Sequence, residues 1–482
     1  MTDENTVVRG GFDADPGVVI AARWLLPMAP GLPSCIDDGA VWVRDGRIAA
    51  VGTLGDVLGQ IHRDGFPVSR VPIDKAAGRV LMPGLINAHT HLFQSYLRGV
   101  HDDGTLETWL SAVIWPWVEH FTDEDYHQAT ALGAMENLRG GVTTVAEHAY
   151  MTGSEDTVEA VASAVAGSGL RAQIAFAFAD QNYPRMLRES ADSVVRKLDR
   201  LRAFCARYPD RLQAAVGPNT LWGVSRDLYR LAGEYATDHD LRLHAHVAET
   251  RLEVDYTLAH YGMRNVEVLD DLGLLTPRLQ MVHCVWVQDD ELERAARGGA
   301  HFVHCPISNM YLASGAPPAW SAVRHGVNVA LATDGPASNN SQDMLETVKF
   351  AACLQKVTLQ DPTVMDAERV LRMATLDAAR ALGLDAQVGS LEPGKLADMT
   401  RVDLGGLHVG PVHNPASALV YNANAADVRD VWVGGRQLLR DGEGVAHDFS
   451  AALERAQRRV SELAGEVTVW DANRLRAEGL QQ

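Results

Sequence analysis

Residues 81–98 read LMPGLINAHTHLFQSYLR, an apolar run that breaks at Pro83-Gly84 and ends in His89-x-His91. In an extended strand, residues i and i+2 project to the same face, so both imidazoles would point into one space and could share a metal ion. Two solvated or hydrogen-bonded histidines are the alternative interpretation of so short a motif. The rest of the chain must supply further ligands for a metal site to exist.

Seven more segments with the pattern of buried strands follow this one, separated by amphipathic helical patterns. The eight candidate strands cover residues 80–89, 142–148, 171–178, 211–218, 241–246, 279–284, 300–305 and 327–334. Eight parallel β-α units over roughly 300 residues fit a closed barrel, whose usual length is about 250 residues with insertions to beyond 400. We therefore predict an α/β fold with a (β/α)8 TIM-type barrel over residues 79–383. A doubly wound open sheet is the alternative architecture.

The two ends of the chain are β-rich and mirror one another. Residues 17–78 contain short apolar runs with a hairpin signal at Asp45-Gly46, and residues 384–445 contain a second hairpin signal at Gly434-Gly435. The simplest arrangement combines both ends into one small β-sandwich, with the barrel inserted between them. Residues 1–16 are predicted as a tail, and residues 446–482 as a C-terminal helical segment.

Composition restricts the class of protein and its partners. The chain has 482 residues and a net charge of −19, which opposes binding to nucleic acid or to an anionic membrane and favours a small neutral or cationic substrate. No apolar run approaches the roughly 20 residues needed to cross a bilayer, and the acidic amino terminus does not resemble a secretory signal. The five cysteines are scattered without a C-x-x-C pair, which argues against disulfides and a thiolate zinc site. A cytoplasmic location is expected.

Polar residues at the carboxyl ends of barrel strands carry the chemistry of this architecture. Six of the eight predicted strands have histidine or aspartate there, namely His89 and His91, His148, His246, His283, His304 and Asp334. Any one of these histidines alone is more simply a hydrogen-bonded core or rim residue. So many at one end of a barrel indicate a shared metal site.

Longer motifs around these residues carry a resemblance to a known family. The chain resembles the amidohydrolase superfamily in MPGLINAHTHLFQSYLRG, HAHVAET, MVHCVWV, VHCPISNMYLASG, HGVNVALATDGPASNNSQDM and GSLEPGKLADM. The match is closest to the aminohydrolase branch, which contains S-adenosylhomocysteine and adenosine deaminases, guanine and 8-oxoguanine deaminases and triazine hydrolases. It covers residues 80–440 and implies a metal-dependent hydrolase acting on C–N bonds of cyclic amidines.

The resemblance implies roles for individual residues. The family's ligands for one divalent metal ion match His89, His91, His246 and Asp334, its catalytic glutamate matches Glu249, and the histidine that assists in activating water matches His283. The fourth predicted strand has no lysine, so the carboxylated-lysine bridge of the family's two-metal members is not implied. Zinc suits three histidines and one aspartate, with iron, cobalt and manganese as alternatives.

These residue types fit the chemistry that the resemblance implies. A divalent ion lowers the pKa of its bound water toward neutrality, and Asp334 and His283 could accept the proton of that water. Glu249 could protonate a ring nitrogen beside the attacked carbon and pass a proton to the leaving amine. Glu249, His283 and Asp334 are therefore the predicted catalytic residues.

Four residues are candidates for substrate contact. Gln94 matches a glutamine that contacts the base in guanine deaminases, and Trp115 could form a flat wall for an aromatic ring. His304 and Asn309 match positions that line the family's pocket. For each of the four, a packing or rim role is the alternative.

Two departures from the family pattern bear on the substrate. Val118 stands where the nucleoside deaminases carry a glutamate for the ribose hydroxyls, with Glu119 one residue off, and Asn219 replaces a histidine after the fourth strand. We therefore predict deamination of a free purine or pterin base or an s-triazine, with release of ammonia or an amine. The alternatives are hydrolysis of a triazine C–Cl bond or of a phenylurea or carbamate, deamination of a nucleoside or S-adenosylhomocysteine, and a non-catalytic scaffold. The resemblance also implies a homodimer or homotetramer.

Overall fold

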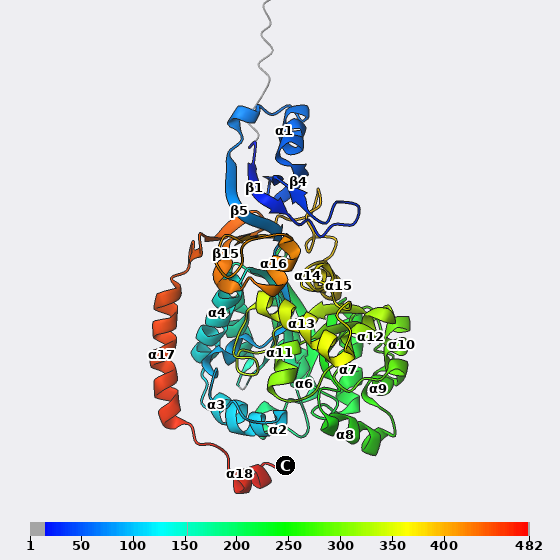
Figure 1. Cartoon of the computed structure of the whole chain (residues 1–482). Helices are drawn as coiled ribbons and strands as arrows, with labels where there is room; N and C mark the ends of the chain where they lie inside the picture. The colour runs from blue at the N-terminus through cyan, green and yellow to red at the C-terminus, as the bar shows by residue number, and fades with distance from the viewer. Residues whose placement is uncertain (1–14, 152, 481–482) are drawn as a thin grey trace, which may run out of the picture.

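A computed structural model describes residues 15–151 and 153–480 of the chain. It shows a barrel with an attached β-sheet that lies at one end of the molecule (Figure 1). The predicted tail, residues 1–16, lies almost entirely outside the described residues. No helix in the described ranges is long and apolar enough to cross a membrane.

Eight parallel strands form the nearly closed barrel in strict chain order, from β6 to β13. The Asp334 N–H, just after the last strand, donates to the His89 carbonyl of the first at 3.1 Å and helps to join the two edges. The predicted (β/α)8 barrel is confirmed. Its strands are β6 (Leu85–Thr90), β7 (Val142–Tyr150), β8 (Arg171–Phe178), β9 (Leu212–Pro218), β10 (Arg242–Val247), β11 (Leu279–His283), β12 (His301–His304) and β13 (Asn328–Leu331).

Helices pack around the barrel between its strands (Figure 1). The first long one begins at a capping box, in which Thr122 and Asp125 exchange side-chain to backbone hydrogen bonds, and it ends at Gly140. The main outer helices are α4 (Asp123–Arg139), α5 (Glu155–Ser168), α6 (Ala191–Cys205), α7 (Arg226–Asp238), α8 (Arg251–Tyr261), α10 (Asp289–Gly298), α12 (Ala319–Arg324) and α13 (Met344–Leu359).

Both ends of the chain combine, as predicted, and they form a second sheet in the region where we predicted a small β-sandwich. This sheet is one continuous mixed sheet in the order β17-β16-β15-β14-β5-β1-β3-β4, with β2 beside β1. The central pair joins the two ends, because β14 runs antiparallel to β5. Its strands are β1 (Val18–Leu25), β2 (Ile36–Asp37), β3 (Gly39–Arg44), β4 (Arg47–Thr53), β5 (Ile73–Pro83), β14 (Met399–Asp403), β15 (Val428–Val433), β16 (Arg436–Arg440) and β17 (Glu443–Gly444).

The two predicted hairpins are present and lie against each other. Asp45 and Gly46 have φ of 50° and 74°, and Gly434 and Gly435 have φ of 55° and 74°, so each turn needs residues that tolerate a left-handed backbone. A Cβ on Gly46 would lie 2.7 Å from the Gly434 carbonyl oxygen. Glycine at position 46 therefore also permits the close approach of the two chain ends.

The boundary between the sheet and the barrel differs from the predicted one. Residues 80–83 belong to β5 of the outer sheet, where Val80 pairs with Val402, and the barrel strand β6 begins only at Leu85. Gly84 lies between them, and a Cβ there would overlap the Thr143 side chain at 2.1 Å. The apolar run is continuous because both strands are buried, so the hydrophobic pattern alone did not separate them.

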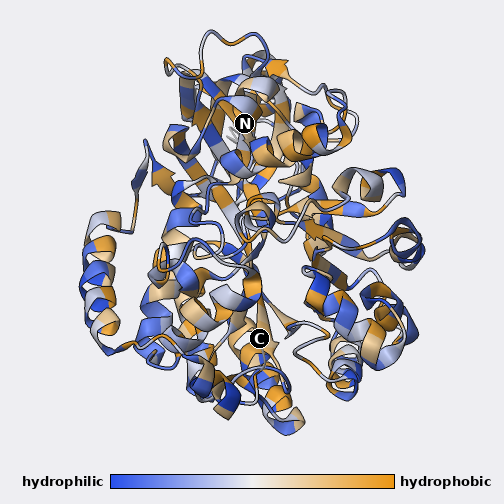
Figure 2. Ribbon diagram, turned by 60° about the horizontal axis from the view of Figure 1, so that its bottom comes forward, coloured by the Kyte–Doolittle hydropathy of each residue, from blue (hydrophilic) through white to orange (hydrophobic). Residues whose placement is uncertain are grey.

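The C-terminal helical segment is also present. The helix α17 (Phe449–Glu466) lies along α4, held by Arg459, whose guanidinium donates to both carboxylate oxygens of Asp125 at 2.7 and 3.0 Å. The chain then continues to the short helix α18 (Ala472–Ala477), which in Figure 1 lies below α2 (Leu106–Trp109) and α3 (Trp115–Val118). Figure 2 views the molecule with this end turned forward.

A buried carboxyl group supports the loop that follows the first barrel strand. Glu147 in β7 is 1% exposed, and its Oε2 accepts the Leu92 N–H at 2.8 Å. Its Oε1 has no hydrogen-bond partner among the described residues. Burial raises the pKa of Glu147 to about 8, so this side chain is a neutral acid at neutral pH.

Glu147→Gln should reduce the loss of folding stability that occurs as pH rises from about 4.5 to about 8. The native state keeps the Glu147 proton up to about pH 8, whereas the unfolded chain loses it near the ordinary glutamate pKa of 4.5. The native state therefore binds more protons between these pH values, and stability falls as pH rises through them. We expect the variant to be more stable than the wild type at pH 9 by about 2–4 kcal/mol, and similar at pH 5. Denaturant unfolding of both metal-loaded proteins at the two pH values measures this, and equal losses would contradict it.

Candidate active site

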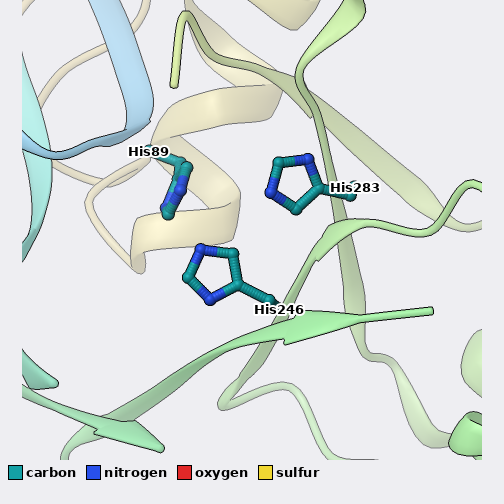
Figure 3. A group of neighbouring side chains, drawn as sticks. All are labelled: His89, His246 and His283. Atoms are coloured by element: carbon teal, nitrogen blue, oxygen red, sulfur yellow. The ribbon is translucent and has the colours of Figure 1, made fainter. Parts of the chain in front are cut away.

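The predicted metal ligands come together at the carboxyl end of the barrel. His89 lies in β6 and His91 directly after it, His246 in β10, and Asp334 shortly after β13. All four side chains are buried. Figure 3 shows the rings of His89 and His246 near that of His283, the last residue of β11.

The donor atoms of these residues fall in three overlapping groups, and within each group they lie within 4.8 Å of one another. The groups are His89 with His246 and His283, His91 with His148 and His246, and His89 with His91 and Asp334. In the third group, the Nε2 atoms of His89 and His91 lie 3.2 and 3.4 Å from Asp334 Oδ1. His148 is a further buried imidazole in the cluster, with both ring nitrogens unpartnered among the described residues.

Hydrogen bonds on the far side of each ring determine which nitrogen faces the cluster. Burial lowers the pKa of the imidazoles of His89, His91, His246 and His283, so these rings are neutral and each has one N–H. The Nδ1 of His91 contacts the His148 carbonyl at 2.6 Å, and the Nδ1 of His246 contacts the Asn219 carbonyl at 3.2 Å. Since a carbonyl can only accept, both rings have N–H at Nδ1 and a lone pair at Nε2.

A longer chain orients His89. Gln280 donates its amide nitrogen to Gln173 Oε1 and to the Ala381 carbonyl, both at 2.8 Å, so its oxygen accepts from His244 Nδ1. His244 Nε2 must then accept from His89 Nδ1, at 2.7 Å. The Nε2 of His89, which is buried and has no hydrogen-bond partner among the described residues, is therefore a free lone pair. Lone pairs facing a carboxylate at 3.2–3.4 Å repel one another unless a cation lies between them, so the cluster fits a divalent metal ion.

Breaking this chain should weaken metal binding. Gln280→Met removes the acceptor of His244 and frees the His89 ring to rotate, so we expect the metal dissociation constant to rise about 10–100-fold, the usual effect of losing an outer partner of a ligand. Competition with a chelator measures it. Gln173→Met is the matched control, because Ala381 still orients the Gln280 amide. Unchanged affinity in Gln280→Met would contradict the assigned role.

Asp334 is held as an ionised ligand. Its Oδ2 accepts from Ser308 Oγ at 2.6 Å and Ser338 Oγ at 3.0 Å, and its Oδ1 accepts the Gly335 N–H at 2.8 Å. Burial would raise the pKa of Asp334, but the neighbouring histidines and Ser308 outweigh it and hold the pKa below its ordinary value. Asp334 also has φ of 67°, a left-handed backbone that aims the carboxylate and that aspartate tolerates better than most residues.

Glu249 and His283 form an acid–base pair beside the cluster. Glu249 follows β10, is 3% exposed, and has its Oε2 3.4 Å from His283 Nε2. Burial, followed by the charges of Glu253, Asp334 and Glu107, raises the pKa of Glu249 well above its ordinary value. His283 Nδ1 contacts Asn309 Oδ1 at 3.0 Å, which leaves a lone pair at Nε2. At neutral pH this pair can therefore offer a carboxylic acid proton and an imidazole base.

A cavity of about 390 Å³ opens over these groups. His91, His246, Glu249, His283 and Asp334 form its deep end. Gln94 lines it from η2 (Leu92–Tyr96) and donates its amide nitrogen to Tyr150 Oη at 3.0 Å. Trp115 lines it from α3 (Trp115–Val118), with its ring centroid 6.2 Å from that of Tyr183.

Two of the predicted substrate contacts lie outside the cavity. His304 is fully buried, does not line the cavity, and has its pKa lowered to about 3 by burial. Asn309, in α11 (Pro306–Tyr311), also does not line it and instead contacts His283. His283 lines the cavity and Asn309 contacts its Nδ1, so Asn309 is placed to orient the His283 ring.

Val118 and Glu119 bring no carboxylate to the cavity. Val118 is fully buried, and Glu119 accepts a hydrogen bond from Arg474 at 2.6 Å. Asn219 does line the cavity. The cavity has other acidic and aromatic residues that no motif indicated, and it includes residues from the far C-terminal end of the chain: Glu107, Tyr183, Glu253, Leu475 and Leu480.

The chain is similar to a known protein family and to proteins of named activity. A model of the amidohydrolase family matches residues 80–438. A 5'-deoxyadenosine deaminase from Methanothermobacter thermautotrophicus is 38% identical over 430 residues, which is 89% of this chain and 95% of that protein. A 5-methylthioadenosine/S-adenosylhomocysteine deaminase from Teredinibacter turnerae is 37% identical over 87% of this chain and 91% of that protein.

A solved structure is also similar over almost the whole chain. The crystal structure of an adenosine deaminase from Xanthomonas campestris with bound zinc superposes with a TM-score of 0.85. It is 34% identical and covers 93% of this chain and 99% of that chain. The fold of the barrel and the outer sheet is therefore shared with this solved relative over almost its whole length.

Proposed function

Because the chain belongs to the amidohydrolase family, we propose that it is a metal-dependent deaminase that replaces the 6-amino group of an adenine nucleoside with oxygen and releases ammonia. The observation that carries this proposal is the pair at the deep end of the cavity. A buried, protonated Glu249 lies 3.4 Å from His283 and beside a cluster of imidazole lone pairs and one carboxylate. This is the arrangement that attack of water on an amidine carbon requires.

The metal would be held by His89, His91, His246 and Asp334. Zinc is the metal that we propose, supported by the donor set and by the zinc in the similar adenosine deaminase. Iron, cobalt and manganese suit the same donors less specifically. When bound, the ion would supply a water activated for attack by lowering the pKa of that water toward neutrality.

The residues of the chain move the protons. The Glu249 carboxyl donates its proton to N1 of the purine, the ring nitrogen beside C6, as water attacks C6. One proton of the water passes to Asp334 or His283 and reaches the leaving amine through Glu249, now a carboxylate. The second proton leaves the C6 hydroxyl as the C6–N bond breaks and the C6=O bond forms, and Glu249 accepts it. Water and the aminopurine are thus converted to the oxopurine and ammonia, and Glu249 ends protonated as it began.

For the substrate, we propose the nucleoside alternative in place of the predicted free base. Val118 led us to expect a free base, but the relatives are named as nucleoside deaminases, which supports the nucleoside alternative better. The cavity offers a different carboxylate for ribose hydroxyls. Glu107, in α2 (Leu106–Trp109), lines the cavity and has no side-chain partner in the part of the chain that the structure describes.

Glu107→Gln should weaken binding of the ribose. A hydrogen bond from a hydroxyl to a carboxylate contributes about 1.5–3 kcal/mol, so we expect KM for 5'-deoxyadenosine to rise about 10–100-fold with little change in kcat. A 2',3'-dideoxy analogue, which lacks both hydroxyls, should bind poorly to the wild type and be almost unaffected by the substitution. Steady-state kinetics on the two substrates measures this. An equal loss on both would show that Glu107 does not hold the hydroxyls.

A panel of substrates tests the proposed function itself. The zinc-loaded protein should release ammonia from 5'-deoxyadenosine, 5'-methylthioadenosine or adenosine with a kcat/KM at least about 100-fold above that for adenine or guanine, because the free bases forfeit every contact beyond the purine. Ammonia from guanine or an aminotriazine alone would restore the free-base prediction. Turnover only of a chlorotriazine, phenylurea or carbamate would overturn deamination.

The expected homodimer or homotetramer and the cytoplasmic location stay predictions.

A further inference from the structure

The last described part of the chain, residues 467–480, forms part of the wall of the cavity. We call it the C-terminal segment. It follows α17 and contains α18, which lies at the end of the molecule opposite the outer sheet (Figure 1). Leu475 and Leu480 are only 4% and 6% exposed although they lie near the end of the chain. Both line the cavity together with Gly479, so their buried faces point at the space where a substrate would bind.

Three contacts fix the segment across the mouth of the barrel. The Trp470 ring centroid lies 6.1 Å from that of Trp115, itself a wall of the cavity. Arg474 donates to Glu119 Oε1 at 2.6 Å. At the other end, Glu478 Oε2 accepts the Arg185 N–H at 3.1 Å. The segment thus joins the loop after β6 to the loop after β8, and Glu119 serves as its anchor.

The side chains that line the cavity near the C-terminal segment include apolar and anionic ones. Leu106 and Leu110 line it from the loop after β6, and Leu475 and Leu480 from the C-terminal segment. Among the described residues that line the cavity there is no lysine or arginine, whereas Glu107 and Glu253 are present with Glu249. A substituent with its own carboxylate would find no cation here, but a small apolar group would find the four leucines.

We propose that the C-terminal segment is the part of the substrate site that selects nucleosides with a small, apolar 5' substituent. This inference rests on the proposed function, which places C6 of the purine at the deep end. The 5' carbon is the part of a nucleoside that lies farthest from C6 across the ribose, so it faces the open end that Leu475 and Leu480 cover. A 5'-deoxy or 5'-methylthio group fits this wall, and the amino-acid chain of S-adenosylhomocysteine does not.

The test compares substrates that differ only at the 5' position. In a Leu475→Ala/Leu480→Ala variant, kcat/KM for 5'-methylthioadenosine should fall at least about 10-fold, mainly through KM, because two side chains lose their contact with the methylthio group. For adenosine, whose 5' hydroxyl gains little from an apolar wall, the fall should stay below about threefold. Leu453→Ala in α17, a leucine that is 59% exposed and outside the cavity, is the matched control and should change neither value.

A second variant keeps the wall in place and changes its charge. Leu480→Lys should raise kcat/KM for S-adenosylhomocysteine relative to 5'-methylthioadenosine by at least about 10-fold, because it supplies the missing cation for the carboxylate. Thermal unfolding and metal content identify variants that fail to fold.

The outcomes separate the two proposals. If the wild type deaminates no nucleoside, the proposed function fails. If the wild type deaminates nucleosides but the leucine variant loses the same factor on every substrate, or Leu480→Lys leaves the ratio unchanged, the inference about the C-terminal segment is overturned and the proposed function stands.

Discussion

Glu249→Gln is expected to lower kcat for deamination by about 10²–10⁴-fold, the range that a positioned acid–base group contributes. Glutamine has the shape of the protonated side chain and occupies the same buried site, but it has no acidic proton to give to N1 of the purine and cannot pass one to the amine. Bound metal should remain at one ion per chain, because Glu249 is not among the donors of the cluster. Initial-rate kinetics and elemental analysis of the same preparation measure both quantities.

Glu253→Gln is the matched control for this substitution. Glu253 is a second buried carboxyl group of the cavity, four residues on, and its Oε2 accepts the Glu249 N–H at 3.1 Å. Glutamine preserves that acceptor, so we expect a loss of less than about 10-fold. If Glu249→Gln kept more than a tenth of wild-type kcat for deamination, the acid–base role of Glu249 would be wrong. Loss of chloride from a triazine needs less protonation, so it should suffer less from the same change.

Asp334→Ala is expected to abolish both metal binding and activity. The substitution removes the one carboxylate from a set of three neutral imidazoles and leaves the Ser308 and Ser338 hydroxyls without their acceptor. Bound zinc should fall below about a tenth of an ion per chain after dialysis, and deamination should fall to background, at least about 10³-fold below the wild type.

Asp240→Asn is a control for the effect of removing an aspartate. Asp240 is exposed, precedes β10 at the amino-terminal end of the barrel, and pairs with Arg278. We expect full metal content and full activity from this variant.

Adding excess zinc to Asp334→Ala should not restore more than about a hundredth of the rate. Full activity at ordinary zinc concentrations would show that Asp334 is not required as a ligand.

Much of the fold could be predicted because local signals agree with the tertiary structure. The strand ends at His89, His246 and His283 follow from apolar runs of strand length, and the left-handed residues at Asp45-Gly46 and Gly434-Gly435 mark real hairpins. The boundary at Gly84 could not be predicted, since the strands on both sides are buried and equally apolar. Only the pairing of Val80 with Val402, far away in the sequence, separates them.

The site was predictable at its centre and not around it. The H-x-H pair and the HVAET motif point to the central residues. By contrast, His244, Gln280 and Ser308 act through hydrogen bonds to residues far away in the sequence, and no spacing in the sequence reveals them. The substrate prediction depended on Val118 and Asn219, yet the carboxylate of Glu107 enters the cavity from a neighbouring helix. Leu475 and Leu480 reach it from the opposite end of the chain, which only tertiary structure can show.

In the proposed mechanism, one metal ion held by the His/Asp cluster is required for deamination of an adenine nucleoside. The most direct measurement is a titration of metal-free protein with zinc, in which ammonia released from 5'-deoxyadenosine is followed against bound zinc per chain. We predict a rate that rises linearly and stops rising at one ion per chain, with one ammonia formed for each nucleoside consumed. A protein that binds one zinc ion per chain and releases no ammonia from the nucleoside would contradict the proposed function.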